Sequence, residues 1–331
     1  MGTSQGRTDE MKYRPFGRVG TPVAEIGFGT WGMGGWSGSD DTASRAALRR
    51  GLELGCNFLD TARAYGDGHS ERLIRDVLSG WDGPAPFIAT KVPPKNGRWP
   101  ARPDYLLDDV FPADHVRRAT EESLENLGID RLDLQQFHVW TDAWAADDRW
   151  QRAVADLKAE GLVKAFGISI NRWEPANAIR ALQTGLIDAV QVVYNIFDQA
   201  PEDELFPACR ELGVAVIARV PFDEGSLTGT MTASDTWPAS DWRSLYFTPD
   251  KLRATLARVE RLQADLPDGM ALPELALRFI LHHPAVTTVI PGMRKVGHVE
   301  RNLAASDGRA FPPALLDAMR RHRWDRDEVI P

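Results

Sequence analysis

Short runs of apolar and β-branched residues alternate with amphipathic stretches along almost the whole chain. This alternation predicts strands separated by helices, and it constrains the fold more than any single motif does. We predict eight strands: Val23–Gly29, Asn57–Asp60, Phe87–Val92, Leu132–His138, Val163–Ile168, Ala189–Tyr194, Val214–Val220 and Val286–Ile290. Eight strand–helix units with right-handed crossovers favour an α/β fold of the (β/α)8 TIM-barrel type, and a doubly wound sheet is the alternative.

The segments outside these units predict additions to one barrel domain over residues 11–331. Residues 11–22 resemble a small β-hairpin that could cover the bottom of the barrel. Extra helices are expected after the seventh strand and at the C-terminus, at Pro249–Asp265, Pro273–His283 and Pro312–His322. Asp114 is placed to cap a helix that runs to Leu127. The polar residues 1–10 predict a disordered tail.

Composition narrows the classes of function. The net charge of −8 argues against a general nucleic-acid or membrane surface, and no apolar run approaches the length of a membrane span. The only cysteines, Cys56 and Cys209, form no CxxC pair, so we expect a reducing, cytoplasmic setting. No HxxxH metal motif is present, so we predict no metal site, and no GxSxG nucleophile elbow follows a predicted strand.

Polar residues follow three successive predicted strands. Asp60 ends the second strand and Tyr65 lies just beyond it, Lys91 lies at the end of the third, and His138 ends the fourth. Each residue alone has an ordinary structural explanation, as a turn, a solvated strand end or a core histidine. Together they favour a site, because Asp and Lys are rarely buried without partners and because the chemistry of a barrel lies at the carboxyl ends of its strands.

These four groups could protonate an oxygen. A phenol is a poor acid at neutral pH, and the ammonium of Lys91 is expected to lower the pKa of Tyr65. Asp60 would keep Lys91 charged and in place. His138 could donate a hydrogen bond that orients a substrate carbonyl. The arrangement suits reduction of a carbonyl group and lacks only a source of hydride.

A glycine motif, GFGTWG at residues 27–32, matches the GxGxxG fingerprint of a Rossmann dinucleotide site. In a Rossmann fold the third glycine opens a helix, but here MGGWSGSDD intervenes before a helix near Thr42. Asp60 also lies further on than the usual acidic partner. We therefore favour a tight glycine turn at a strand end.

The ordered motifs NFLDTARAYGDGHSE, IATKV, LQQFH, FGIS, PFDEGSLTG and VIPGMRKVGHVERNL resemble the aldo-keto reductases. The resemblance runs from about Tyr13 to the terminal helix. It implies that Asp60, Tyr65, Lys91 and His138 form the catalytic tetrad of that family, with Tyr65 as proton donor. It also implies a nicotinamide cofactor, usually NADP(H), extended over the top of a barrel.

The resemblance also implies a set of cofactor contacts. The carboxamide would be held by Ser169, Asn171 and Gln191, the pyrophosphate by Pro221, Phe222, Gly225, Ser226 and Leu227, and the adenosine end by Gly292, Met293, Arg294, His298 and Asn302. Arg294 could pair with a 2′-phosphate, with Lys295 adding charge, so NADP(H) is favoured over NAD(H).

Three positions depart from the family pattern. The usual adjacent Ser-Asn pair is interrupted here by Ile170. Arg219 stands where many members have an aromatic ring that stacks on the nicotinamide, and its guanidinium could stack or meet an anionic group. His298 replaces what is often a longer polar or basic residue near the adenosine. None of these positions belongs to the tetrad.

The substrate is expected to be a small carbonyl compound. An aromatic pocket could be formed by Trp31, Trp36, Trp99, Trp140, Trp144 and Phe222. Sugars, polyketide-like ketones and aromatic aldehydes all fit such a pocket. The leading hypothesis is an NADPH-dependent reductase, and the alternative is a nicotinamide-binding sensor like the potassium-channel beta subunits that the family includes.

Overall fold

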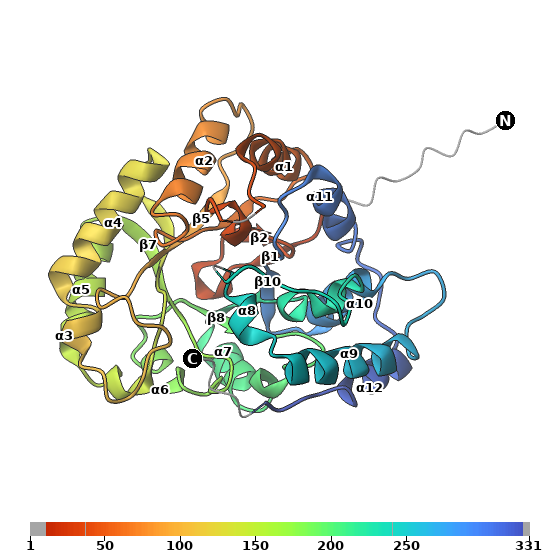
Figure 1. Cartoon of the computed structure of the whole chain (residues 1–331). Helices are drawn as coiled ribbons and strands as arrows, with labels where there is room; N and C mark the ends of the chain where they lie inside the picture. Colours follow the sequence, from red (N-terminus) through yellow and green to blue (C-terminus); the bar gives the residue numbers. More distant parts are fainter. Residues whose placement is uncertain (1–10, 37, 240, 327–331) are drawn as a thin grey trace.

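A closed parallel barrel forms the centre of the computed structural model, which describes residues 11–36, 38–239 and 241–326 (Figure 1). Its strands are β3 (Phe28–Gly29), β4 (Phe58–Asp60), β5 (Phe87–Val92), β6 (Leu132–Phe137), β7 (Val163–Ser169), β8 (Ala189–Val193), β9 (Ala215–Arg219) and β10 (Val286–Val289). They pair in sequence order, and parallel bridges from Ile26 to Val289 and from Gly29 to Gly292 close the ring. The predicted barrel is confirmed and the doubly wound alternative is wrong.

An N-terminal hairpin covers the bottom of the barrel. Strand β1 (Tyr13–Pro15) pairs antiparallel with β2 (Pro22–Ala24), so the first predicted strand is in fact divided between the hairpin and β3. The hairpin connection contains the 3-10 turn η1 (Gly17–Val19). Its Phe16 is fully buried and packs on Phe58 and Phe87 at ring distances of 5.9 and 4.7 Å. These rings fill the lower end of the barrel.

Helices surround the barrel (Figure 1). They are α1 (Asp41–Glu53), α2 (His69–Leu78), α3 (Leu107–Val110), α4 (Ala113–Leu127), α5 (Asp148–Ala159), α6 (Ile179–Leu182), α7 (Leu205–Leu212), α8 (Arg243–Tyr246), α9 (Pro249–Gln263), α10 (Leu272–His282), α11 (Val296–Leu303) and α12 (Pro313–Arg320). The predicted additions after the seventh barrel strand and at the C-terminus correspond to α9, α10 and α12. Asp114 lies in the first turn of α4 and is not its cap, because the helix begins one residue earlier, after Pro112.

Short 3-10 turns occupy several loops above the strands, namely η2 (Trp31–Met33), η3 (Asp142–Trp144), η4 (Ala200–Glu202) and η5 (Asp223–Thr228). The tail predicted over residues 1–10 lies outside the described residues. No helix in the described ranges has the length and apolar character needed to cross a membrane.

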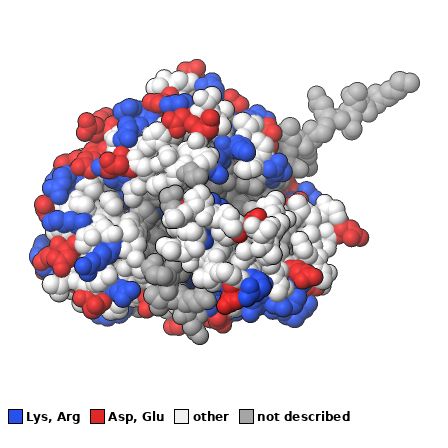
Figure 2. Space-filling model, in the orientation of Figure 1, with Lys and Arg blue, Asp and Glu red and all other residues white. Residues whose placement is uncertain are grey.

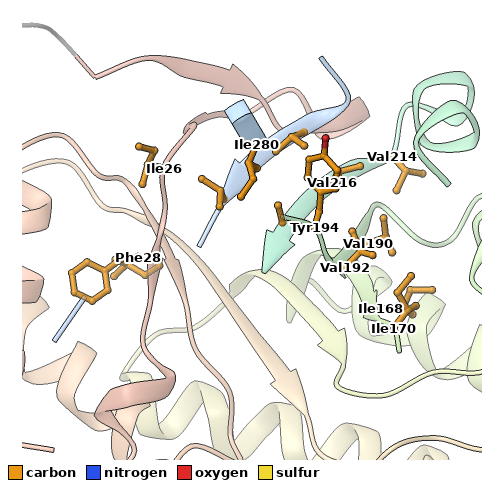
Figure 3. Packing of buried hydrophobic residues seen from close by; sticks show 14 of the residues in the cluster. Ile26, Phe28, Ile168, Ile170, Val190, Val192, Tyr194, Val214, Val216 and Ile280 are labelled. Carbon is orange, nitrogen blue, oxygen red and sulfur yellow. The ribbon is translucent and has the colours of Figure 1, made fainter. Parts of the chain in front are cut away.

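Alternation along the strands separates two apolar layers. One layer fills the barrel and contains Phe58, Ala89, Leu134, Ala189 and Ile217. The other packs between the strands and the helices, and Figure 3 shows Val190, Val192 and Val216 among its members. At the upper ends of the strands, the side chains that this alternation directs into the barrel are polar instead of apolar.

Candidate active site

A buried ion pair lies inside the upper end of the barrel. Lys91 in β5 donates from Nζ to Oδ1 of Asp60 in β4 at 2.6 Å and to the carbonyl oxygen of Thr61 at 2.7 Å. Lys91 is fully buried and Asp60 is nearly so. Burial alone would lower the pKa of Lys91, but Asp60 and Tyr65 outweigh that effect and raise it. Lys91 is therefore held as an ammonium ion.

Tyr65 lies on the turn between β4 and α2, with its Oη 3.4 Å from Lys91 Nζ. The turn depends on glycine, since Gly66 has a φ of +64° and an added Cβ would come within 2.0 Å of the carbonyl oxygen of Gly34. Burial, assisted by Asp60, raises the pKa of Tyr65, although Lys91 acts to lower it. The expectation of a lowered pKa is wrong, because loss of hydration outweighs the ammonium.

His138 directly follows β6 and faces the same space. Burial, together with the positive charges of Lys91 and Arg219, lowers the pKa of His138 well below its usual value, so the imidazole is neutral at physiological pH. Its ring lies 5.7 Å from that of Tyr65 and 4.5 Å from that of Trp99. A neutral imidazole can donate one hydrogen bond to an uncharged oxygen.

The other wall of the barrel mouth carries the positions predicted for the carboxamide. Ser169 ends β7. Asn171 donates to the carbonyl oxygen of Ala101 at 3.3 Å, and Gln191 donates to Oδ2 of Asp60 at 2.8 Å. The amide of Gln191 is thus a partner of the Asp60–Lys91 pair, since it takes up the carboxylate oxygen that Lys91 leaves free.

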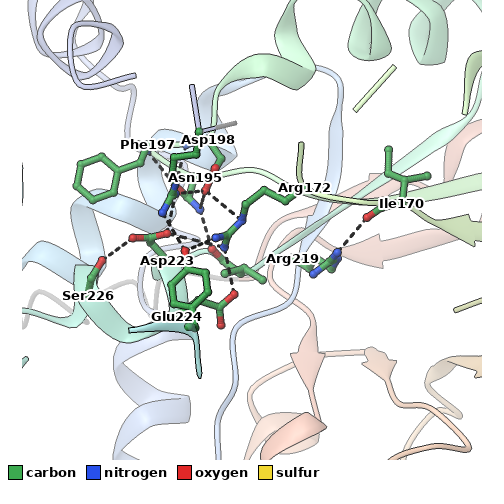
Figure 4. Close-up of polar contacts among 12 residues, drawn as sticks. Ile170, Arg172, Asn195, Phe197, Asp198, Arg219, Asp223, Glu224 and Ser226 are labelled. Carbon is green, nitrogen blue, oxygen red and sulfur yellow. Dashed lines mark hydrogen bonds and ion pairs between the residues drawn. The ribbon is translucent and has the colours of Figure 1, made fainter. Parts of the chain in front are cut away.

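A second group of charged residues, which we call the loop cluster, consists of Arg172, Asp198, Asp223, Glu224 and Arg326. Figure 4 labels the first four of them. Arg326, near the C-terminus, donates from Nη2 to Asp198 at 2.6 Å and to Asp223 at 2.8 Å. Arg172 pairs with Glu224 at 3.1 Å. Sequence reasoning missed this cluster, because its members belong to separate loops and the tail.

The loop cluster holds a strained segment after β9. Val220, Asp223 and Glu224 have φ values of +57°, +43° and +58°, which side-chain-bearing residues rarely adopt. Asn195 donates to the carbonyl oxygen of Val220 at 3.0 Å, and Ser226 donates to Oδ2 of Asp223 at 2.8 Å. The surrounding contacts therefore fix a backbone shape that the residues themselves do not favour.

The positions predicted for the cofactor fall into two groups. Leu227 and Met293 are fully buried in the core, Asn302 is buried in α11, and Phe222 is half-buried against the core. Pro221 is buried at the start of the strained segment. The second group, which we call the open group because its members are not packed into the core, comprises Gly225, Gly292, Arg294 and His298. An added Cβ at Gly292 would have nothing within 4 Å, and Gly225 adopts a φ of +107°.

Arg294 supplies positive charge at the end of this open group. It is half-buried and makes no hydrogen bond or ion pair within the described part of the chain. The neighbouring His298 lies at the surface, where partial desolvation and the positive charges of Arg301, Lys295 and Arg294 lower its pKa. The guanidinium of Arg294 is thus available to an anion.

The glycine motif at residues 27–32 serves close packing. An added Cβ at Gly29 would come within 2.7 Å of the carbonyl oxygen of Ile290, and one at Gly32 within 2.6 Å of Cδ of Arg294. After Gly32 the chain continues through η2, and α1 begins only at Asp41. A substitution at Gly32 would therefore also displace Arg294, so it cannot separate a Rossmann site from a barrel site.

Tryptophans line one side of the mouth. Trp31, Trp36 and Trp99 are 44%, 36% and 44% exposed. The ring of Trp36 lies 6.4 Å from that of Tyr65 and 5.5 Å from that of Trp31. The assignment of Trp140 and Trp144 to this pocket is wrong: both are buried, and Trp140 packs against Phe137 at 5.8 Å, within the outer core. Figure 2 shows the side of the molecule seen in Figure 1, where most Lys, Arg, Asp and Glu side chains gather around the rim.

A sequence model described as the Aldo/keto reductase family matches residues 25–322. The chain belongs to this family. The fold and the ordered motifs agree with this membership.

Several relatives of this aldo-keto reductase are known. The aldo-keto reductase YhdN of Bacillus subtilis is 28% identical over 88% of this chain and 87% of its own length. The NADH-specific methylglyoxal reductase of Escherichia coli is 28% identical over 89% and 93%. The holo form of the aldo-keto reductase AKR11C1 from Bacillus halodurans superposes with a TM-score of 0.76, at 28% identity, over 96% and 98% of the two chains.

Metal ligands are not grouped in this aldo-keto reductase: among the described residues, no three His, Cys, Asp or Glu side chains come together as a metal ion would require. Cys56 and Cys209 are both buried and unpaired. Burial raises the pKa of each thiol to about 12, so neither is a reactive thiolate at neutral pH.

Proposed function

We propose that this aldo-keto reductase reduces an aldehyde or ketone to an alcohol with NADPH, and that Tyr65 donates the proton. The observation that carries the proposal is the line of contacts from Asp60 through Lys91 to Tyr65, beside a neutral His138. No other part of the described chain combines a proton donor, a fixed cation and a neutral hydrogen-bond donor at an open barrel mouth.

The residues have distinct parts in the proposed reaction. The nicotinamide cofactor, when bound, supplies a hydride to the carbonyl carbon. Tyr65 gives its hydroxyl proton to the carbonyl oxygen, and the raised pKa of Tyr65 keeps that proton in place at neutral pH. Lys91 stabilises the phenolate that remains, and His138 orients the carbonyl oxygen. Asp60, held by Gln191, fixes the position of Lys91.

The open group of residues fits a dinucleotide. Backbone can approach a pyrophosphate closely at Gly225 and Gly292, because neither glycine has a side chain to obstruct it. Arg294 lies near Asp241 but has no directly bonded partner in the described chain, so its guanidinium suits a 2′-phosphate. Lys295 and Arg301 add positive charge nearby. These features support NADP(H) over NAD(H). One relative, from E. coli, is named as NADH-specific, so membership of the family does not by itself decide between the two cofactors.

The tryptophans support a substrate with a flat or apolar face. Trp31, Trp36 and Trp99 form an aromatic wall beside Tyr65 and His138. Phe222 is half-buried on the strained segment after β9. Such a wall suits aromatic aldehydes, polyketide-like ketones and sugars, since each offers a face for stacking. The two buried thiols are compatible with the reducing cytoplasm that we propose as the setting.

The test combines binding with turnover. NADPH and NADH are titrated by quenching of tryptophan fluorescence, and NADPH oxidation is then followed with a panel of aldehydes, ketones and sugars. Tyr65→Phe should bind NADPH like the wild type and lose turnover by about 10²- to 10⁴-fold. Tyr13→Phe is the matched control, because that tyrosine lies on the hairpin at the bottom of the barrel.

Three other outcomes would contradict the proposal. Tight NADPH binding with no turnover of any carbonyl would favour a nicotinamide sensor. Failure of both nucleotides to bind would overturn the assignment of the whole site. Full turnover by Tyr65→Phe would show that Tyr65 is not the proton donor.

A further inference from the structure

Arg219 is a cation at the mouth of the barrel with few partners. Ala215 and Ile217 of β9 face the barrel interior, so alternation turns Arg219 inward at the uppermost level. Its Nη2 donates to the carbonyl oxygen of Ile170 at 3.0 Å, and its buried Nε has no hydrogen-bond partner within the described residues. Arg219 also makes no ion pair in the described part of the chain.

The carboxylates nearby are engaged elsewhere. Glu224, which lies close enough to stabilise the charge of Arg219, is bonded to Arg172 at 3.1 Å. Asp60 is bonded to Lys91. Figure 4 shows the guanidinium of Arg219 directed at Ile170 and apart from the loop cluster. A positive charge is thus present at the mouth without a directly bonded counter-ion.

The strand order shows what Arg219 faces. Going around the closed barrel, β5 lies opposite β9. Tyr65 and His138 follow β4 and β6, on the two sides of β5, and they would hold the carbonyl oxygen there. A hydride donor must approach the carbonyl carbon across one face of the carbonyl plane, so it lies beside the substrate and not beyond its oxygen. The predicted carboxamide positions Ser169 and Gln191 lie on β7 and β8, and β8 pairs with β9. Given the proposed function, the nicotinamide ring then lies between the substrate and the end of β9, with its rear face toward Arg219.

We propose that the guanidinium of Arg219 lies against the rear face of the nicotinamide and selects the neutral reduced ring over the positively charged oxidised ring. The dihydronicotinamide of NADPH carries no ring charge, and the pyridinium of NADP+ carries one positive charge. A like charge at a poorly hydrated mouth raises the free energy of the oxidised complex. The consequence is tight binding of NADPH and ready release of NADP+ after the hydride has been transferred.

The charge and the stacking of Arg219 can be separated by two variants. Dissociation constants of NADPH and NADP+ are measured by fluorescence and calorimetry for the wild type, Arg219→Gln and Arg219→Lys. Arg219→Gln removes the charge and should lower the ratio of the NADP+ constant to the NADPH constant by about tenfold, which is about 30 mV in the potential of the bound two-electron couple. Arg219→Lys keeps the charge and should stay within about twofold of the wild-type ratio.

Further measurements identify the source of any change. The same shift in ratio is expected for NADH and NAD+, because the ring chemistry is the same. It should persist at high salt, since Arg219 is screened less than an exposed charge. Arg45→Gln, on the outer face of α1, is the control and should alter neither constant. Thermal unfolding of each variant checks that the fold is intact.

The outcomes distinguish this proposal from the proposed function. If Arg219→Gln weakens both forms equally, the guanidinium binds a phosphate or another anion common to both, and the inference is wrong. If Arg219→Lys changes the ratio as much as Arg219→Gln does, charge is not the cause and the inference is again wrong. Failure of the wild type to bind any nicotinamide nucleotide would overturn the proposed function itself.

Discussion

Two buried groups of charges lie at the same end of the barrel, and they are built differently. Asp60 and Lys91 form a single pair on neighbouring strands, completed by Gln191 and the carbonyl oxygen of Thr61. The loop cluster has five charged residues and draws them from loops and the C-terminal tail. The sheet holds the pair in position. The loop cluster, in contrast, holds its own backbone in a shape that the residues do not favour.

This difference separates two requirements of a reductase. Proton transfer needs groups held within a few tenths of an ångström, and strands provide that rigidity. Cofactor exchange needs a segment that can open, and loops provide it. Three strained residues, Val220, Asp223 and Glu224, lie in the second region, and the turn that carries Tyr65 has one, Asp67, with a φ of +53°. We therefore expect chemistry to depend on the pair and cofactor affinity to depend on the loop cluster.

Lys91→Met should have the largest effect. Removing the ammonium leaves Asp60 buried without its counter-ion, so the free energy of unfolding should fall by about 3–5 kcal/mol in urea titrations. Turnover should fall by about 10²- to 10⁴-fold. The double variant Asp60→Asn with Lys91→Met should regain part of the stability and none of the turnover. Equal recovery of both would mean that the pair is only structural.

Arg326→Gln should have an intermediate effect. It leaves Asp198 and Asp223 with the more distant Arg172, whose nitrogens are 3.8 Å from each carboxylate. We expect the dissociation constant of NADPH to rise by about tenfold, about 1.4 kcal/mol, while kcat at saturating NADPH is unchanged. The control is Arg323→Gln, three residues away in an exposed pair with Asp203, which should have little effect. Similar losses of NADPH affinity in the two variants would show that the loop cluster has no special role in cofactor binding.

Trp31→Leu should have a smaller effect. Its ring contacts Trp36 and makes no ring contact with Tyr65 or His138 among the described residues. KM for aromatic carbonyl substrates should rise by about 2- to 10-fold, as expected for loss of one aromatic pair, with kcat unchanged. A short aliphatic aldehyde is the control substrate and should show no change. A fall in kcat for both substrates would indicate that Trp31 helps to hold the four predicted catalytic residues in position.

Changing the pH from about 6 to 9 should have the smallest effect on the rate of reduction. Reduction needs Tyr65 protonated and His138 neutral. The pKa of Tyr65 is raised above its usual value of about 10, and that of His138 lies well below its usual value of about 6.5. Both groups therefore keep the required state throughout the range. A midpoint near pH 6.5 in kcat at saturating NADPH would contradict the assigned state of His138.

The barrel could be predicted from the sequence, and three of the predicted site residues could be placed together, for the same reason. Strand periodicity is local, and the carboxyl ends of parallel strands meet, so Asp60, Lys91 and His138 could be placed together without knowing any contact. The loop cluster could not be found this way, because Arg326 and Asp198 are 128 positions apart and neither ends a strand. Their spacing carries no periodic signal.

Two other expectations failed because burial cannot be read from a motif. The pKa of Tyr65 is raised because desolvation outweighs Lys91, and the extent of that desolvation depends on how the mouth is packed. Trp140 follows the fourth barrel strand as a pocket residue would, but it is fully buried against Phe137 and Trp150. A sequence shows where such a ring lies along the chain. It does not show whether the ring points into the barrel or outward toward the helices.

The most direct test of the division between the two regions measures NADPH affinity and single-turnover hydride transfer at saturating NADPH in Tyr65→Phe and Arg326→Gln, alongside the wild type. We predict opposite results: Tyr65→Phe keeps the affinity and loses the transfer, and Arg326→Gln loses affinity and keeps the transfer. Loss of both properties in both variants would contradict the account, because it would show that the pair and the loop cluster act as one unit.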